Sequence, residues 1–261
     1  MLGRPIAHSL SPVLHRAAYR SLGLAWTFDA IDVGVDELAP LLASRGPEWA
    51  GFACTMPLKR AVLDVASSVS PRASAVGAAN TLLHRSDGGW LADNTDVAGI
   101  GAALREAGVD GPATVTVLGA GGTAQAAVVA LAELGVRRCV VQVRDVARTS
   151  ELAATARWAG VEIDLAPLGD SRADLVISTL PPGAADPLAD RVRAGALLDA
   201  VYTPWPTPLA AAALESGAAV ISGALMLLHQ AAVQVELMTG RPAPVEAMRT
   251  ALRDAAPGCG V

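Results

Sequence analysis

Near its middle the chain reads TVTVLGAGGTA over residues 114–124, an apolar run that passes directly into a glycine-rich turn. The β-branched part, 114–118, has the length and composition of a buried parallel strand. Residues 123–134, rich in Ala, Val and Leu, predict a helix that ends at Gly135, the usual glycine position after a helix. Residues 138–143 predict the next strand, so these elements form one strand–helix–strand unit.

The alternation continues toward the C-terminus. Strands are predicted at 161–165, 174–178, 196–199 and 219–221, and helices at 151–158 and 209–215. The proline-rich run 202–208 cannot form a helix interior and predicts a loop. Strands that alternate with helices in this way predict an α/β domain with a parallel, doubly wound sheet.

The first hundred residues repeat the alternation more weakly and predict a second α/β domain. Its elements are a helix from Ser11-Pro12 to Leu22, strands at 27–33 and 51–55, helices at 35–44 and 60–66, and a hairpin of 81–84 and 89–92 across Asp87-Gly88. Residues 225–237 predict one long helix, and periodicity alone does not say where it packs.

Composition excludes several classes of protein. The net charge of −5 and the lack of a basic run argue against a nucleic-acid surface or an anionic-lipid surface. Cys54, Cys139 and Cys259 are too few and too scattered for a disulfide framework or a zinc site, so we expect unpaired thiols, no bound metal and a reducing cytosol.

One uncharged segment, 113–132, is long enough to cross a bilayer. Its centre is Gly119-Ala120-Gly121-Gly122, however, which favours a strand, a tight turn and a helix over a membrane span. The first residues also lack the basic and apolar regions of a signal peptide. We therefore expect a soluble protein.

The turn fits the dinucleotide-binding pattern G-x-G-x-x-A between a strand and a helix, the fingerprint of a Rossmann-type domain. The first glycine permits the tight turn, the second lets the backbone approach a pyrophosphate, and the last small residue lets helix and strand pack closely. The helix start then offers unpaired N–H groups to the anion. The predicted cofactor-binding residues are Gly119, Ala120, Gly121, Gly122, Thr123 and Ala124.

The residues after the second strand distinguish NAD from NADP. An acidic residue there holds the ribose 2′-hydroxyl of NAD, whereas arginine pairs with the 2′-phosphate of NADP. Arg144 follows the strand and Arg148 comes shortly after, so NADP is favoured over NAD. Asp145 leaves NAD as an alternative cofactor, because its carboxylate either neutralises Arg144 or binds the ribose hydroxyl of NAD.

Polar residues also gather at predicted strand ends and turns of the first domain. Ser9 and Ser11 offer two hydroxyls at a helix start, where Ser11 also reads as a plain N-cap. Lys59 follows Thr55-Met56-Pro57-Leu58 in an otherwise apolar turn, and Asn80 and Asp96 follow predicted strands. Taken alone, such residues are more often solvated than catalytic.

The blocks GRPIAHSLSP (3–12), TMPLK (55–59), VGAANT (76–81) and DNTD (93–96) resemble the signatures of the shikimate dehydrogenase family. The glycine turn, residues 202–209 and residues 223–230 resemble further blocks of that family in the same order, so the resemblance covers essentially the whole chain.

The resemblance implies NADP-dependent reduction of 3-dehydroshikimate to shikimate, a step of aromatic amino-acid biosynthesis. It implies a substrate domain of residues 1–97 plus 224–261, separated by a cleft from a cofactor domain of residues 98–223, in a monomer or homodimer. By position, Lys59 and Asp96 would be the catalytic pair and Gly223 would lie at the cofactor. The implied substrate-binding residues are Ser9, Ser11, Thr55, Asn80, Tyr202 and Gln230.

Two departures from the family pattern matter. Ala53 stands where the family usually has an Asn that holds substrate hydroxyls, which leaves a quinate or aminoshikimate dehydrogenase as an alternative. The family also has several more residues of first strand before Met1, so either that strand is short here or the true start lies upstream. A different class, a non-catalytic sensor of shikimate-like ligands, would need neither Lys59 nor a complete glycine turn.

Overall fold

A computed structural model describes residues 1–261, apart from the side chain of Arg148. The predicted role of Arg148 therefore falls outside the described part of the chain. The chain divides into two compact units. Unit 1 comprises residues 1–95 and 230–255, and unit 2 comprises residues 96–229 and 256–261.

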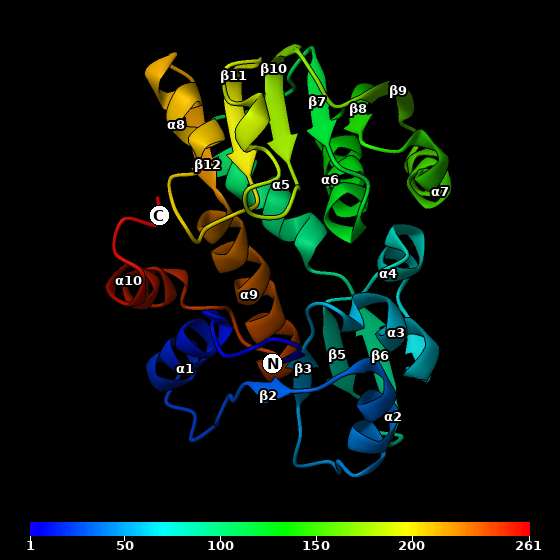
Figure 1. The fold of residues 1–261 in the computed structure, drawn as a ribbon. Coiled ribbons are helices and arrows are strands. Elements are labelled where there is room, and N and C mark those ends of the chain that lie inside the picture. The colour runs from blue at the N-terminus through cyan, green and yellow to red at the C-terminus, as the bar shows by residue number, and fades with distance from the viewer. The chain divides into compact units, whose positions relative to one another are not determined.

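Unit 2 is built on a six-stranded, all-parallel sheet in the order β12-β11-β10-β7-β8-β9 (Figure 1). The strands are β7 (Val115–Leu118), β8 (Arg138–Val143), β9 (Glu162–Pro167), β10 (Ser171–Ser178), β11 (Val192–Asp199) and β12 (Ala219–Ser222). The chain leaves β7 in one direction for β8 and β9 and in the other for β10, β11 and β12. This reversal is the switch point of a doubly wound sheet, at which ligands bind.

The helices of unit 2 follow from these crossovers. They are α5 (Asp96–Glu106), α6 (Gly122–Glu133), α7 (Ser150–Ala159) and α8 (Pro208–Glu215), with short 3₁₀ turns at Val146–Arg148 and Asp186–Leu188. Helix α6 packs beside α5 and α7, whereas α8 packs on β11 and β12 (Figure 1). Right-handed crossovers that run in opposite directions from β7 place α6 and α8 on opposite faces of the sheet.

Unit 1 has a mixed sheet in the order β3-β5-β6-β4 and a parallel pair, β1-β2, linked to it by a bridge from Leu2 to Cys54. The strands are β1 (Leu2–Gly3), β2 (Ile31–Asp32), β3 (Gly51–Ala53), β4 (Ser68–Val69), β5 (Thr81–His84) and β6 (Trp90–Asp93). β5 and β6 form the predicted antiparallel hairpin. Phe52, Leu58, Leu82 and Trp90 belong to the apolar core beneath this sheet.

Six helices contribute to unit 1, one of them only in part. They are α1 (Ser11–Ser21), α2 (Val35–Ala43), α3 (Leu58–Val65), α4 (Pro71–Val76), α10 (Val245–Ala255) and the second half of α9 (Gly223–Thr239). Helix α10 packs against α1. α9 is the predicted long helix, and it begins in unit 2 and ends in unit 1.

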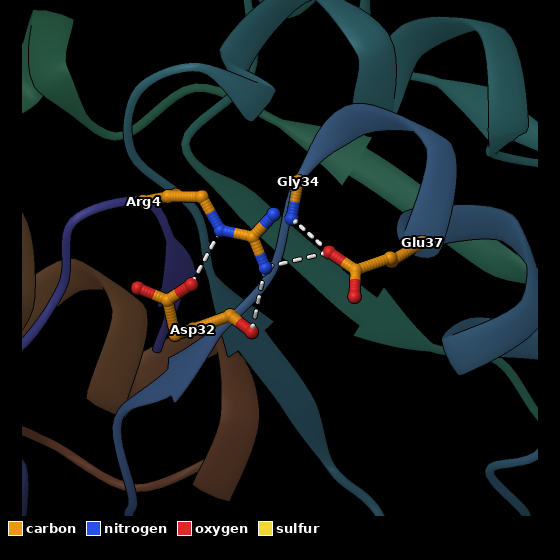
Figure 2. Close-up of polar contacts among 4 residues, drawn as sticks. All are labelled: Arg4, Asp32, Gly34 and Glu37. Atoms are coloured by element: carbon orange, nitrogen blue, oxygen red, sulfur yellow. Dashed lines mark hydrogen bonds and ion pairs between the residues drawn. The ribbon is translucent and has the colours of Figure 1, made fainter.

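A cluster of charges ties the loop after β1 to β2 and α2 (Figure 2). The Arg4 guanidinium donates to the Asp32 carboxylate and, at 2.6 Å, to Glu37 Oε2. The same Glu37 oxygen accepts a hydrogen bond of 2.8 Å from the backbone of Gly34. Since Arg4 begins the segment that leads to Ser9 and Ser11, these bonds anchor one end of that segment.

The structure corrects several predicted elements. Residues 27–33 form a ladder only at Ile31–Asp32, because β1 is the neighbour that pairs with this segment and it spans two residues. Helices α4, α5 and α10 and strand β4 were not predicted from the sequence. The uncharged segment 113–132 does contain the predicted strand, turn and helix, and within the described residues no helix has the length and apolar character needed to span a bilayer.

The expected domain boundaries at 97 and 224 stay a prediction; the compact units divide at 95/96 and 229/230. Residues 256–261 group with unit 2, since Ser222 donates to the carbonyl of Cys259 at 2.5 Å and Gly260 lies against Trp205. The boundary within α9 falls between His229 and Gln230, because His229 bonds Glu106 of α5 at 2.7 Å.

Candidate active site

Three of the polar residues of unit 1 meet in a buried cluster. Asn80 precedes β5, Thr95 follows β6, and Gln230 lies on α9. The Asn80 amide nitrogen donates to Thr95 Oγ1 at 2.9 Å and to Gln230 Oε1 at 3.1 Å. The structure therefore brings together two predicted substrate-binding residues that are 150 positions apart.

The backbone around Asn80 fixes this cluster in place. Its N–H donates to the carbonyl of Asp93 at 3.1 Å, and its carbonyl accepts from Cys54 N at 2.7 Å. The Thr95 N–H donates to Asn80 Oδ1 at 2.8 Å, so the chain that enters Asp96 is held by the Asn80 side chain. Because Thr95 directly precedes Asp96, these bonds fix the position at which α5 begins.

Lys59 lies in the first turn of α3, which begins at Leu58 after the turn Thr55-Met56-Pro57. The Lys59 carbonyl accepts a bond of 2.7 Å from Ala79 N, which fixes the helix start beside the residue before Asn80. Thr55 shapes the same turn, since its carbonyl accepts from Leu58 N at 2.8 Å. Lys59 and Asn80 are therefore carried by segments that are bonded to each other.

Asp96 is the first residue of α5 and is buried. A carboxylate in the first turn of a helix is favoured by the helix dipole and by the unpaired N–H groups there. Asp96 directly follows Thr95, so it adjoins the buried cluster along the chain.

Ser9 and Ser11 lie together at the start of α1. The backbone N–H of Ser11 donates to Ser9 Oγ at 3.3 Å. Leu10 occupies the N-cap position and Ser11 is the first helical residue, so the reading of Ser11 as an N-cap was wrong. The two hydroxyls therefore occur at a helix start, where Ser9 Oγ accepts from the backbone and Ser11 is buried.

The glycine turn has one glycine in a tight backbone position and another beside open space. Gly119 has φ of +110°, and a Cβ there would lie 2.5 Å from Thr179 Oγ1. At Gly121, the N-cap of α6, a Cβ would meet no atom within 4 Å, so the turn leaves space for a ligand to approach the backbone. The first turn of α6 has no acidic residue, and Ala124 is buried, which allows close packing of helix and strand.

Arg144 follows the end of β8 and is exposed to solvent. Asp145 caps the next 3₁₀ turn, since its carboxylate accepts from Ala147 N at 3.0 Å. The Asp145 carboxylate makes this capping bond, and among the described residues Arg144 forms no ion pair with it or with another acidic side chain. The arrangement favours a 2′-phosphate over a ribose hydroxyl as the group that Arg144 would bind.

Tyr202 and Gly223 lie in unit 2, one after β11 and the other at the start of α9. Tyr202 is partly buried in the proline-rich loop, and burial raises the pKa of its hydroxyl, which therefore stays a neutral donor. A Cβ at Gly223 would lie 2.1 Å from the Ala200 carbonyl oxygen. Close backbone packing thus accounts for glycine at 223 whether or not it touches a cofactor.

Three residues that complete the buried network of unit 1 were not predicted from the sequence. His15 of α1, Thr81 of β5 and Gln234 of α9 are each at most 1% exposed and bond one another or Asn80. Thr95 was named only as part of a polar block. The one available signal was spacing, because Gln230 and Gln234 are four residues apart and so share a face of their helix.

Across the described residues no group of three or more metal-ligating side chains occurs.

The switch point between β7 and β10, the glycine turn and the uncapped start of α6 define a dinucleotide-binding α/β protein. A second unit carries its own buried polar cluster.

Comparison with known proteins identifies the family. The model of the shikimate dehydrogenase substrate binding domain matches residues 1–82, and that of the shikimate 5'-dehydrogenase C-terminal domain matches residues 223–253. A curated shikimate dehydrogenase (NADP(+)) from Synechococcus sp. is 36% identical, over 97% of this chain and 92% of the relative. The chain belongs to the shikimate dehydrogenase family.

Solved structures agree with this assignment over the whole chain. The crystal structure of Mycobacterium tuberculosis shikimate dehydrogenase is 46% identical, with a TM-score of 0.91 and 97% of each chain covered. The Thermus thermophilus enzyme in complex with NADP(H) and shikimate is 34% identical, with a TM-score of 0.86 and 97% of each chain covered. A quinate dehydrogenase from Corynebacterium glutamicum, in complex with NAD, is 28% identical, with a TM-score of 0.84, 97% of each chain again being covered.

Proposed function

We propose that this chain catalyses the reversible NADP-linked reduction of 3-dehydroshikimate to shikimate. The observation that carries the proposal is similarity along the whole chain to curated NADP(+)-dependent shikimate dehydrogenases and to a structure that holds both NADP(H) and shikimate. The geometry of the glycine turn supports the cofactor, and the buried Asn80–Thr95–Gln230 cluster supports a polar substrate.

The residues of unit 2 fit a dinucleotide. The backbone of Gly119–Ala124 would hold the pyrophosphate and Arg144 the 2′-phosphate. When bound, NADPH supplies the hydride that reduces the substrate ketone. The protein has to bind the substrate, orient it and supply a proton.

Lys59 and Asp96 are the proposed catalytic pair. A ketone oxygen gains negative charge as its carbon accepts hydride, so a nearby cation lowers the barrier and a proton donor completes the alcohol. Lys59 supplies both the charge and the proton. Asp96 orients the ammonium group and accepts a proton when the reaction runs from the alcohol to the ketone.

Substitution of Lys59 tests these roles. We expect Lys59→Ala to lower kcat by about 10²–10⁴-fold, since general acid catalysis contributes on that order. Shikimate should still bind, which calorimetry measures. Arg60→Ala removes the next cation on the same helix and should leave kcat within about twofold of the wild type. Near-normal kcat in Lys59→Ala would contradict the proposed role.

A quinate or aminoshikimate dehydrogenase is the second candidate. Ala53 favours it, because a buried methyl group replaces the amide that the family uses to hold substrate hydroxyls. NADPH or NADH formation should be followed with shikimate, quinate and an aminoshikimate, each with NADP and NAD. The highest kcat/KM with shikimate and NADP is expected, and a higher value with quinate would favour the second candidate.

We infer a reducing compartment such as the cytosol from the thiols. Cys54, Cys139 and Cys259 are buried thiols outside any disulfide, and burial raises the pKa of Cys54 to about 12 and that of Cys139 to about 11. Thiols in this state are poor nucleophiles and form disulfides slowly.

A further inference from the structure

A chain of buried hydrogen bonds leads from α1 to the substrate cluster of unit 1. Tyr19 Oη lies 3.3 Å from His15 Nδ1, and His15 Nε2 lies 3.2 Å from Gln234 Oε1. The amide nitrogen of Gln234 donates to the Asn80 carbonyl at 3.0 Å and to Thr81 Oγ1 at 2.9 Å. His15 thus touches the cluster only through Gln234.

The orientation of the Gln234 amide follows from its partners. A backbone carbonyl can only accept, so the end of the amide that faces the Asn80 carbonyl has to be NH₂. The other end, which faces His15, is therefore the amide oxygen, and it needs a donor.

The orientation of Gln234 in turn fixes the tautomer of His15. Nε2 has to carry the proton, because it faces the Gln234 oxygen. Nδ1 is then the acceptor in the neutral ring, and the Tyr19 hydroxyl donates to it. Burial lowers the pKa of His15 to about 3, which keeps the ring neutral at physiological pH.

The same reasoning continues to the substrate cluster. The Thr95 N–H can only donate, so the Asn80 atom that it reaches is the amide oxygen, which also accepts from Thr81 Oγ1 at 2.9 Å. The Asn80 NH₂ therefore faces Thr95 Oγ1 and Gln230 Oε1. Gln230 is consequently held by its oxygen, and its NH₂ is the donating end.

We propose that His15 is a positioning residue for the substrate, which acts through Gln234 and the Thr81 hydroxyl to hold the side chain of Asn80, and with it Gln230. This inference rests on the proposed function, because it assigns those two amides to the substrate pocket. Loss of the His15 donor leaves the buried Gln234 oxygen without its donor, so the Gln234 side chain is held less firmly against Thr81.

Three variants test the connection. His15→Phe removes both ring nitrogens and keeps an aromatic ring to stack on Phe28, whose centroid lies 3.9 Å from that of His15. We expect about a tenfold higher KM for shikimate, with kcat and the KM for NADP within about twofold of the wild type. His15→Gln retains an N–H donor and should recover most of the affinity. His15→Phe combined with Gln234→Met should be no worse than Gln234→Met alone, since His15 acts through Gln234.

A structural role alone would give a different pattern. Leu38→Ala, in the core of the same unit, should lower Tm and leave the KM for shikimate unchanged. Additive losses in the double variant would overturn the proposal, as would His15→Phe losses that affect both KM values and kcat in proportion to Tm.

A spectroscopic readout separates this proposal from the proposed function. ¹⁵N NMR of wild-type protein at pH 7 should show His15 neutral with the proton on Nε2, whether or not shikimate is turned over. A proton on Nδ1, or a charged ring, would overturn the positioning role. A wild type with the expected tautomer and no dehydrogenase activity would refute the proposed function alone.

Discussion

At the scale of single residues, His15 shows how burial makes a titratable group part of the fold. The ring is fully buried, stacks on Phe28 and bonds Tyr19 and Gln234, both uncharged groups. Burial is the largest cause of its lowered pKa; the hydrogen bond to Gln234 opposes the shift and the charge of the N-terminal amine adds to it. No carboxylate is among the groups that set this pKa, so protonation of the ring would leave a buried cation without a counterion.

The pH dependence of stability should report this cost. The unfolded chain binds a proton at His15 below pH 6.5, whereas the folded protein binds it only near pH 3. Since the unfolded state holds more protons in this window, His15 lowers the free energy of unfolding by about 1.4 kcal/mol per pH unit on acidification. Urea unfolding at pH 4 to 7 should show that slope as the difference between the wild type and His15→Phe. Parallel curves for the two proteins would contradict the expectation.

At the scale of elements, the two glycines of the turn between β7 and α6 should behave differently. Gly119 has a positive φ and no space for a Cβ, so Gly119→Ala should destabilise unit 2 by about 1–3 kcal/mol. Gly121 has φ of −77° and open space around it, so Gly121→Ala should leave Tm unchanged. Its added methyl group lies where a pyrophosphate would approach, and the KM for NADP should rise about tenfold or more.

Thermal unfolding without cofactor and the KM for NADP measure the two effects separately. Gly119→Ala should lower Tm, whereas Gly121→Ala should raise only the KM for NADP. Equal loss of Tm in both variants would show that the turn is built for packing alone. An unchanged KM for NADP in Gly121→Ala would remove the glycine turn from the cofactor site.

The elements of unit 2 were predictable because each strand of a doubly wound sheet is a short apolar run bounded by turns. Prediction failed where the local sequence pattern favours a different secondary structure from the one that the chain adopts. Helix α5 contains Gly99 and Gly101, which weaken a helical signal, and residues 27–30 look like a strand but make no ladder. The link of His15 to Gln234 spans 219 residues, and no local pattern reveals it.

At the scale of the whole molecule, α9 is the element that belongs to both units. It begins at Gly223 in unit 2 and carries Gln230 and Gln234 in unit 1. A Cβ at Gly223 would meet the Ala200 oxygen at 2.1 Å and its carbonyl carbon at 2.4 Å, so an alanine there forces a backbone shift. Since a helix moves as a rigid body over two or three turns, the shift should displace both glutamines.

We therefore expect Gly223→Ala to lower stability by about 1–3 kcal/mol, the usual cost of overpacking, and to weaken shikimate binding. Calorimetry with shikimate alone measures the second effect without the cofactor, which matters because Gly223 is also a proposed cofactor contact. Gly101→Ala is the matched control, since a Cβ there meets only the flexible end of Arg105, at 3.4 Å, and a helical alanine is favoured over glycine. If Gly223→Ala bound shikimate as tightly as Gly101→Ala, α9 would not transmit the shift, and the position of Gln230 would be set within unit 1 alone.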